Sequence, residues 1–229
     1  FYESFANKKK QPALILKTNG ATYSIMDRED ILNKIKNVKS MFPSDWNFPN
    51  VYLLHGDISR DELNLLYNYP KVKAMVSFTH GEGFGRPLLE ATMTGLTVIA
   101  SAWSGQMDFL ENDNSILIPG ELKQVPKSMV WKDIIIPESQ WFNIYENEAY
   151  QALNHTFENQ GEIKRKGETL MYKNRDKFTL DKMADKLDEI MEKYTSNMPS
   201  QVGLKLPKLK KVESKELPKI KLPKLKKVA

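Results

Sequence analysis

The chain has 229 residues, 41% of them hydrophobic and 28% charged, which is an ordinary composition for a soluble globular protein. It has no cysteine, which excludes a disulfide framework and a cysteine-ligated zinc site, and no apolar run approaches the roughly 20 residues of a membrane-spanning helix. The net charge of +5 is unevenly spread, because residues 202–229 hold ten lysines and two glutamates and therefore carry +8, which leaves the other 201 residues at −3.

The first residues, "FYESFANKKK", are typical of the last turns of a helix that ends in basic residues, which suit the negative end of the helix dipole. The segment lacks the apolar core of a signal peptide, and it lacks an initiator methionine. The absence of cysteine fits a reducing compartment. We therefore expect a cytoplasmic protein whose reading frame extends upstream of this chain.

Short apolar runs then alternate with helical patterns. Buried strands are predicted for the runs that are bounded by breakers, at 13–18, 51–56, 73–79, 97–102 and 115–120. Helices are predicted where apolar residues recur with a 3.6-residue period or a capping signal appears, at 26–42, 59–69, 86–95 and 104–112. The first of these helices is expected to be capped near Asp27, and the second by a capping box of Ser59 and Glu62.

The rest of the chain is predicted to be irregular at 121–143 and helical at 144–159, 161–174 and 179–195, and the last helix has an apolar face that is expected to pack on something. From about residue 196 the periodicity stops. "LPKLKKV" occurs at 206–212 and 222–228, with "LPKIK" between them, and the prolines forbid a continuous helix. We predict a disordered, low-complexity tail at 196–229.

Strands that alternate with helices indicate βαβ units. The predicted fold class is therefore α/β, a Rossmann-like parallel sheet with helices on both faces. It would occupy residues 1–195, including the C-terminal helices.

The stretch "HGEGFGRPLLEA" at 80–91 lies between a predicted strand and a predicted helix. Gly83 and Gly85 would let the backbone approach a ligand closely. Pro87 suits the first helical turn, where its missing N–H costs nothing. The free N–H groups at the start of the helix, together with the helix dipole, would form an anion site at the carboxyl end of a parallel strand, where such sheets bind ligands.

Two glutamates flank this turn. Glu90 lies one helical turn in, where its carboxylate could accept both hydroxyls of a ribose, and Glu82 lies further out on the loop, where it could bind a second sugar. The spacing suits a nucleotide sugar. Either glutamate alone is explained as well by a surface position or by the dipole of a helix N-terminus.

The segment from Thr79 to Gly120 resembles the donor-binding half of GT-B retaining glycosyltransferases of the family 4 type. The matching positions are Glu82, Gly83, Phe84, Gly85, Pro87, Leu88, Glu90, Ala91, Gly95, Val98, Ile99, Ala100 and Ser101. A weaker resemblance extends back through "VYLLHGDISRDELNLLY" and forward to about Tyr194. The resemblance implies transfer of a sugar from a nucleoside-diphosphate sugar to an acceptor hydroxyl with retention of configuration, and no metal or other cofactor.

The resemblance also implies roles for residues. Glu82 is the catalytic candidate, in contact with the transferred sugar, and Glu90 would hold the ribose. The turn Gly56, Asp57 and Ile58 would meet the nucleobase. Candidates to bind the donor sugar and the diphosphate are Gly83, Phe84, Gly85, Arg86 and Leu89. His80 and Lys17 are further candidates by position alone, and a loop histidine and a strand-end lysine that reaches solvent are the alternatives for them.

One departure matters most. The family pairs the diphosphate with an arginine and a lysine after the first strand of this domain. We expect this chain to begin beyond that strand, and therefore to lack both the pair and the acceptor domain. The alternative function is therefore a non-catalytic nucleotide or sugar binder, or a fragment that needs a partner domain. A third hypothesis is attachment of the basic tail to an anionic membrane surface. Nucleic acid is disfavoured as a partner, because the tail has no aromatic residue to stack on bases.

Overall fold

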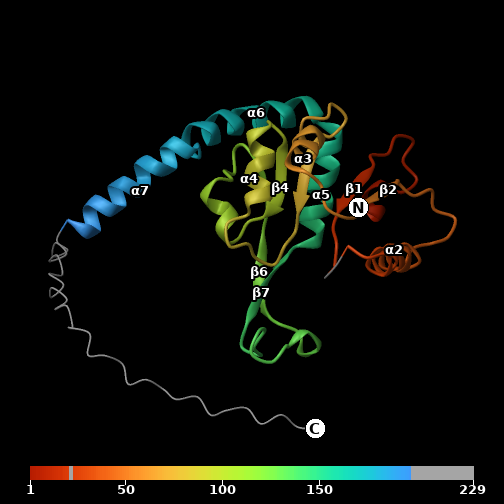
Figure 1. Ribbon diagram of the computed structural model, residues 1–229. Helices are drawn as coiled ribbons and strands as arrows, with labels where there is room; N and C mark the ends of the chain where they lie inside the picture. The colour runs from red at the N-terminus through yellow and green to blue at the C-terminus, as the bar shows by residue number, and fades with distance from the viewer. Residues whose placement is uncertain (21–22, 197–229) are drawn as a thin grey trace, which may run out of the picture. The chain divides into compact units, whose positions relative to one another are not determined.

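The computed structural model describes residues 1–20 and 23–196, and the predicted tail lies outside the described residues except for Ser196. The chain divides into two compact units, Phe1–Asp185 and Lys186–Ala229. The predicted boundary at residue 195 lies within the second unit and stays a prediction. All strands belong to the first unit (Figure 1).

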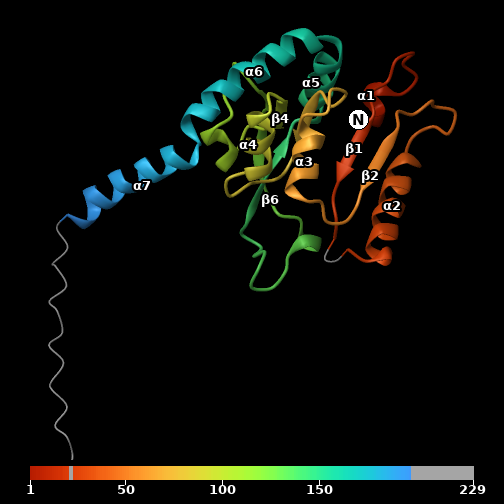
Figure 2. The same ribbon diagram turned by 45° about the horizontal axis from the view of Figure 1, so that its top comes forward.

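Five parallel strands form two sheets. β1 (Leu14–Lys17) pairs with β2 (Val51–Leu54), and β4 (Thr97–Ser101) lies between β3 (Ala74–Ser77) and β5 (Ile116–Ile118). Between them in the chain lie the helices α1 (Tyr2–Phe5), α2 (Ile25–Lys39), α3 (Arg60–Tyr67) and α4 (Arg86–Met93). Figure 2 shows β1 and β2 beside α2. The α/β, Rossmann-like fold class is confirmed.

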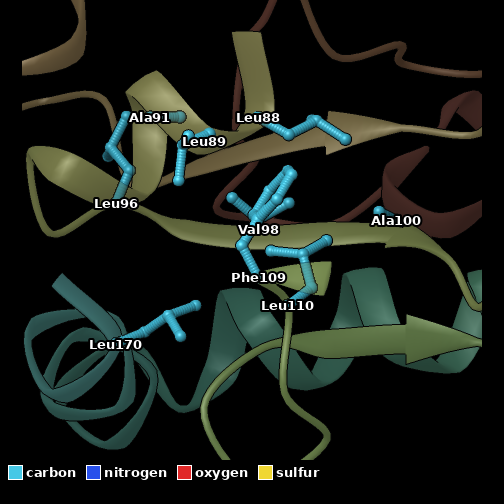
Figure 3. Packing of buried hydrophobic residues seen from close by; sticks show 9 residues of the cluster. All are labelled: Leu88, Leu89, Ala91, Leu96, Val98, Ala100, Phe109, Leu110 and Leu170. Carbon is cyan, nitrogen blue, oxygen red and sulfur yellow. The ribbon is translucent and has the colours of Figure 1, made fainter. Parts of the chain in front are cut away.

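The core lies on both faces of β4, every residue of which is buried. Val98 and Ala100 point to one face, where they meet α4 and α6 (Gln160–Lys177), while Ile99 points to the other face and meets α5 (Glu146–Glu158). On the first face, Leu170 of α6 is fully buried (Figure 3). Helices on both faces explain why β4 is buried along its whole length and has the apolar residues Val98, Ile99 and Ala100 at its centre.

The prediction that residues 121–143 are irregular is wrong in part. Residues 121–143 contain most of an antiparallel hairpin of β6 (Gly120–Gln124) and β7 (Gln140–Ile144), in register from Gly120 with Ile144 to Gln124 with Gln140. β5 is therefore not the last strand. A short 3₁₀ turn, η2 (Lys127–Met129), lies in the loop of the hairpin.

Three helix predictions also need correction. The cap of α2 is Ser24, whose hydroxyl accepts a hydrogen bond from the Asp27 amide. The helix predicted at 104–112 is only the 3₁₀ turn η1 (Gly105–Asp108). α7 (Leu180–Thr195) forms as predicted but has no buried residue, and its apolar face is exposed, with Leu180 86% accessible. By contrast, the capping box of Ser59 and Glu62 is confirmed at α3.

Candidate functional site

Two loops meet at the carboxyl ends of β3 and β4. The Gly105 amide donates a hydrogen bond of 3.0 Å to the Glu82 carbonyl oxygen, and the Ser104 hydroxyl donates to the same oxygen at 2.6 Å. The backbones touch so closely that a Cβ on Gly105 would lie 2.2 Å from the Gly83 carbonyl oxygen. Only glycine fits at this contact, so the loop that bears Glu82 is fixed by the loop after β4.

The Glu82 side chain is half-buried, and within residues 1–20 and 23–196 its carboxylate makes no hydrogen bond or ion pair. Its main chain is held at both ends, because the Glu82 amide also lies 3.3 Å from the Ser104 hydroxyl oxygen. A fixed backbone and an unpaired carboxylate leave Glu82 free to accept hydrogen bonds from a ligand.

α4 begins where the sequence predicted. Its N-cap Gly85 has φ 84°, in the left-handed region that favours glycine, and Pro87 occupies the first turn. The Leu88 and Leu89 amides both donate to the Gly85 carbonyl oxygen. In the part of the chain that the structure describes, the amides of 83–86 donate to no protein acceptor. The amides that are free to bind an anion are therefore those of 83–86, whereas the Leu89 amide, a predicted contributor, is engaged by the Gly85 carbonyl oxygen.

Glu90 is half-buried on α4 and forms an ion pair with Arg86, with 2.9 Å between Nε and Oε1. The ion pair therefore joins the residue that is predicted to bind the ribose, Glu90, to one that is predicted to bind the diphosphate, Arg86. Its spacing of four residues is a sequence signal for such a pair, which our reasoning missed. Burial raises the pKa of the Tyr67 hydroxyl on α3, and the negative charge of Glu90 adds to this shift.

His80 anchors the hairpin to this loop. Its Nδ1 lies 2.9 Å from the Phe142 carbonyl oxygen, and its ring stacks on Trp141 with 4.6 Å between centroids. The Phe142 amide donates back to the His80 carbonyl oxygen at 3.2 Å. Phe142 itself is buried and stacks on Trp103. Trp141 and Phe142 are therefore packing residues in this structure, and a contact of His80 with sugar stays a prediction.

A second group of predicted residues lies at the carboxyl ends of β1 and β2. Gly56 has φ 106°, and the Lys17 ammonium donates a hydrogen bond of 2.7 Å to its carbonyl oxygen. Asp57 accepts a hydrogen bond from the Ile58 amide. Lys17 thus stabilises the turn that is predicted to contact the nucleobase. Binding of its ammonium to a diphosphate stays a prediction.

His55, just before this turn, is nearly buried, and its Nε2 lies 2.7 Å from an Asp27 carboxylate oxygen. The Gly20 amide donates to the same oxygen at 2.8 Å. The hydrogen bond with His55 is the main reason that the pKa of Asp27 is lowered. These contacts fasten the N-terminal end of α2 to the turn that follows β2.

A groove of about 560 Å³ elsewhere in the unit is largely apolar, with charged residues such as Asp30 and Lys34 in its lining, and it does not include the loop of residues 80–86. It is lined by residues of α1, β1 and α2, among them Leu14, Leu16, Ile31 and Ile35. Within the described residues, no group of three or more acidic or histidine side chains could hold a metal ion. No helix in the same ranges is long and apolar enough to cross a membrane.

The candidate site thus combines an α/β fold with a Gly-x-Gly loop and two glutamates at the carboxyl edge of a parallel sheet. Residues 47–132 match a family model described as glycosyl transferases group 1, so the chain carries a segment with the pattern of that family. None of the curated protein sequences matches the chain significantly.

Solved structures of glycosyltransferases share the fold. Sucrose-phosphate synthase from Thermosynechococcus elongatus is 17% identical with a TM-score of 0.56, and the match covers 82% of this chain and 40% of that one. The Anabaena protein HepE, in complex with UDP and glucose, is 16% identical with a TM-score of 0.53, over 78% of this chain and 40% of that one. The chain therefore spans about two fifths of the length of these structures.

Proposed function

We propose that the first unit is the donor-binding domain of a retaining glycosyltransferase of the family 4 type. The observation that carries the proposal is the loop from Glu82 to Arg86. Within the described ranges it presents an unpaired carboxylate and free backbone amides at the carboxyl edge of the sheet. The match of residues 47–132 to glycosyl transferases group 1 supports it.

The chemistry divides between the residues as follows. The amides of 83–86 and the positive end of α4 stabilise the negative charge that develops on the departing diphosphate. The Glu82 carboxylate orients the transferred sugar and offsets positive charge at its anomeric carbon, which the acceptor hydroxyl attacks from the side that the diphosphate leaves. Glu90 accepts the ribose hydroxyls once Arg86 turns from it to the diphosphate. The nucleotide sugar is a co-substrate, and the proposal requires no metal.

The alternative, a nucleotide or sugar binder that needs a partner domain for transfer, is favoured by one observation. The two basic side chains that are predicted to bind the diphosphate are both engaged, Lys17 with the Gly56 carbonyl oxygen and Arg86 with Glu90. Such a chain binds nucleotide without transferring sugar. A transfer assay with and without an added acceptor domain separates the two functions.

The binding proposal is tested by a thermal-shift screen with UDP, GDP, ADP and their glucose conjugates. UDP comes first because HepE was solved with UDP and glucose. Ligand at a hundred times its dissociation constant adds about 2.7 kcal/mol of stability, which such a screen detects easily. If no nucleotide raises the melting temperature at millimolar concentration, the donor-domain proposal is wrong.

We also propose that the basic segment 202–229 attaches the protein to an anionic membrane surface. This proposal rests on its ten lysines, which are interspersed with leucine, isoleucine and valine. The acceptor and its linkage have no assignment.

A further inference from the structure

Trp103 is 40% exposed and lies beside the loop of residues 80–86. It lies two residues after β4, immediately before Ser104 and Gly105, whose hydroxyl and amide hold the Glu82 carbonyl oxygen. Its Nε1 lies 4.0 Å from the place that a Cβ on Gly81 would occupy. Trp103 and Glu82 are therefore carried by the same pair of joined loops.

The indole is also held in a fixed orientation. Its ring stacks on Phe142 with 5.6 Å between centroids and 7° between planes. Phe142 is 7% exposed and is bonded through its backbone to His80. At Ser104 the backbone has φ 74°, an uncommon value for a residue other than glycine, and this conformation sets the turn that carries the indole. One ring face thus packs on the hairpin, and the hairpin limits how the indole can move.

What remains exposed has the chemistry of a sugar platform. A hexose ring presents an apolar face of C–H groups and a rim of hydroxyls, so it needs a flat apolar surface and nearby hydrogen-bonding groups. The exposed part of the indole offers the surface, and covering it removes apolar area from water. The indole N–H has no acceptor among the described residues, and the Glu82 carboxylate is unpaired as well. Phe142 already supplies a buried ring at this contact, so packing of the hairpin does not explain why Trp103 keeps an exposed indole surface.

We propose that Trp103 is the stacking residue for the hexose of the nucleotide-sugar donor. The apolar face of the sugar lies on the exposed indole, and hydroxyls on its rim bind the indole N–H and the Glu82 carboxylate. The inference rests on the proposed donor-binding function and adds to it a residue that selects the sugar and not the nucleotide.

The test compares binding of UDP and UDP-glucose, by calorimetry, to the full chain and to three variants. Trp103→Ala is expected to weaken UDP-glucose about tenfold, at the low end of what loss of an aromatic stacking partner costs, and to leave UDP within twofold. Trp103→Phe should retain most of the affinity, because it keeps a flat ring. Trp131→Ala is the matched control, since Trp131 is 64% exposed in the loop of the hairpin, and it should change neither ligand.

Each other outcome has a defined meaning. Equal weakening of UDP and UDP-glucose by Trp103→Ala would show that the indole only supports the loop, and no weakening of either would remove it from the site; both overturn the inference and leave the proposed function standing. Saturation-transfer NMR with free glucose tests the platform without a nucleotide, because Trp103→Ala should abolish transfer to the sugar. If the unmodified chain binds neither UDP nor UDP-glucose and shows no transfer to glucose, the platform is refuted, while the wider nucleotide screen still decides the proposed function.

Discussion

Replacement of Gly105 by alanine tests the contact on which the candidate site depends. The new Cβ would lie 2.2 Å from the Gly83 carbonyl oxygen, 2.6 Å from its carbonyl carbon and 2.8 Å from the Phe84 Cα. All three are backbone atoms, so no side chain can rotate away to make room. The loops would have to separate by most of an ångström, which would break the hydrogen bonds that hold the Glu82 carbonyl oxygen.

The expected cost follows from these contacts. Overpacking of this kind destabilises a fold by about 1–3 kcal/mol, and each lost hydrogen bond adds about 1 kcal/mol. Two hydrogen bonds hold the Glu82 carbonyl oxygen, so the total cost is about 3–5 kcal/mol. For a chain of this size a loss of 1 kcal/mol lowers the melting temperature by roughly 2–4 °C, so Gly105→Ala should lower it by about 6–20 °C. The variant should also lose nucleotide binding, because the loop that presents the amides of 83–86 moves.

Thermal unfolding followed by circular dichroism, with calorimetry for the ligand, measures both effects. Gly161→Ala is the matched control, because a Cβ at Gly161 in α6 meets nothing within 4 Å. Alanine there should raise stability by up to about 1 kcal/mol through helix propensity. A Gly105→Ala variant that melts at or above the temperature of the unmodified protein would show that the two loops are not packed as described.

Three further predictions concern the two glutamates of the site, Asp27 and the basic segment. Glu90→Gln should weaken UDP and UDP-glucose alike by about 10–100-fold, the loss of a charge-assisted hydrogen bond, while Glu82→Gln should spare UDP in the same calorimetric assay; equal effects on UDP would mean that the roles are wrongly assigned. The lowered pKa of Asp27 stabilises the fold above the ordinary carboxyl pKa, and this contribution is lost as the pH falls through the folded-state value. The melting temperature should therefore fall less steeply below about pH 4 in Asp27→Asn than in the unmodified protein, and parallel curves would contradict this. Truncation after Ser200 should leave the melting temperature unchanged and abolish salt-sensitive sedimentation with anionic vesicles, since each lysine near such a surface contributes about 1 kcal/mol at most; equal sedimentation of both forms would refute the membrane proposal.

Local signals predicted local structure well. The capping box of Ser59 and Glu62 and the glycines at 85 and 95 bound α3 and α4 as expected, because each signal acts within one turn of the chain. The hairpin was missed because β6 reads "GELKQ", with polar residues that have low strand propensity, and its partner strand begins 16 residues after β6 ends. The cap of α2 was misplaced because Ser24 and Asp27 both suit an N-cap, and only the structure shows that the Ser24 hydroxyl accepts from the Asp27 amide.

In the candidate site too, local arrangements could be predicted from the sequence and long-range contacts could not. Glu82, Gly83, Gly85 and Glu90 could be placed together from the sequence, since they share one strand–loop–helix unit. The stack of Trp103 on Phe142 joins residues 39 positions apart through a hairpin that was not predicted, so no pattern in the sequence pointed to it. The bond from Lys17 to Gly56 likewise depends on the pairing of β1 with β2, which places Lys17 opposite Leu54.

The segment that matches the glycosyltransferase family does not by itself hold the candidate site in place. Leu170 of α6 is fully buried in the core that holds α4, and a Cβ on Gly167 would lie 2.5 Å from the Gly95 carbonyl oxygen, so α6 packs directly on the turn after α4. The buried Asn174 amide donates to the Thr92 hydroxyl and to the Phe109 carbonyl oxygen, which ties α4 to the end of η1. All three α6 residues lie beyond position 132, where the family match ends. The orientation of the Glu82 loop thus depends on a helix outside the recognised segment, and substitutions in α6 will reach the site through α4 without touching a ligand.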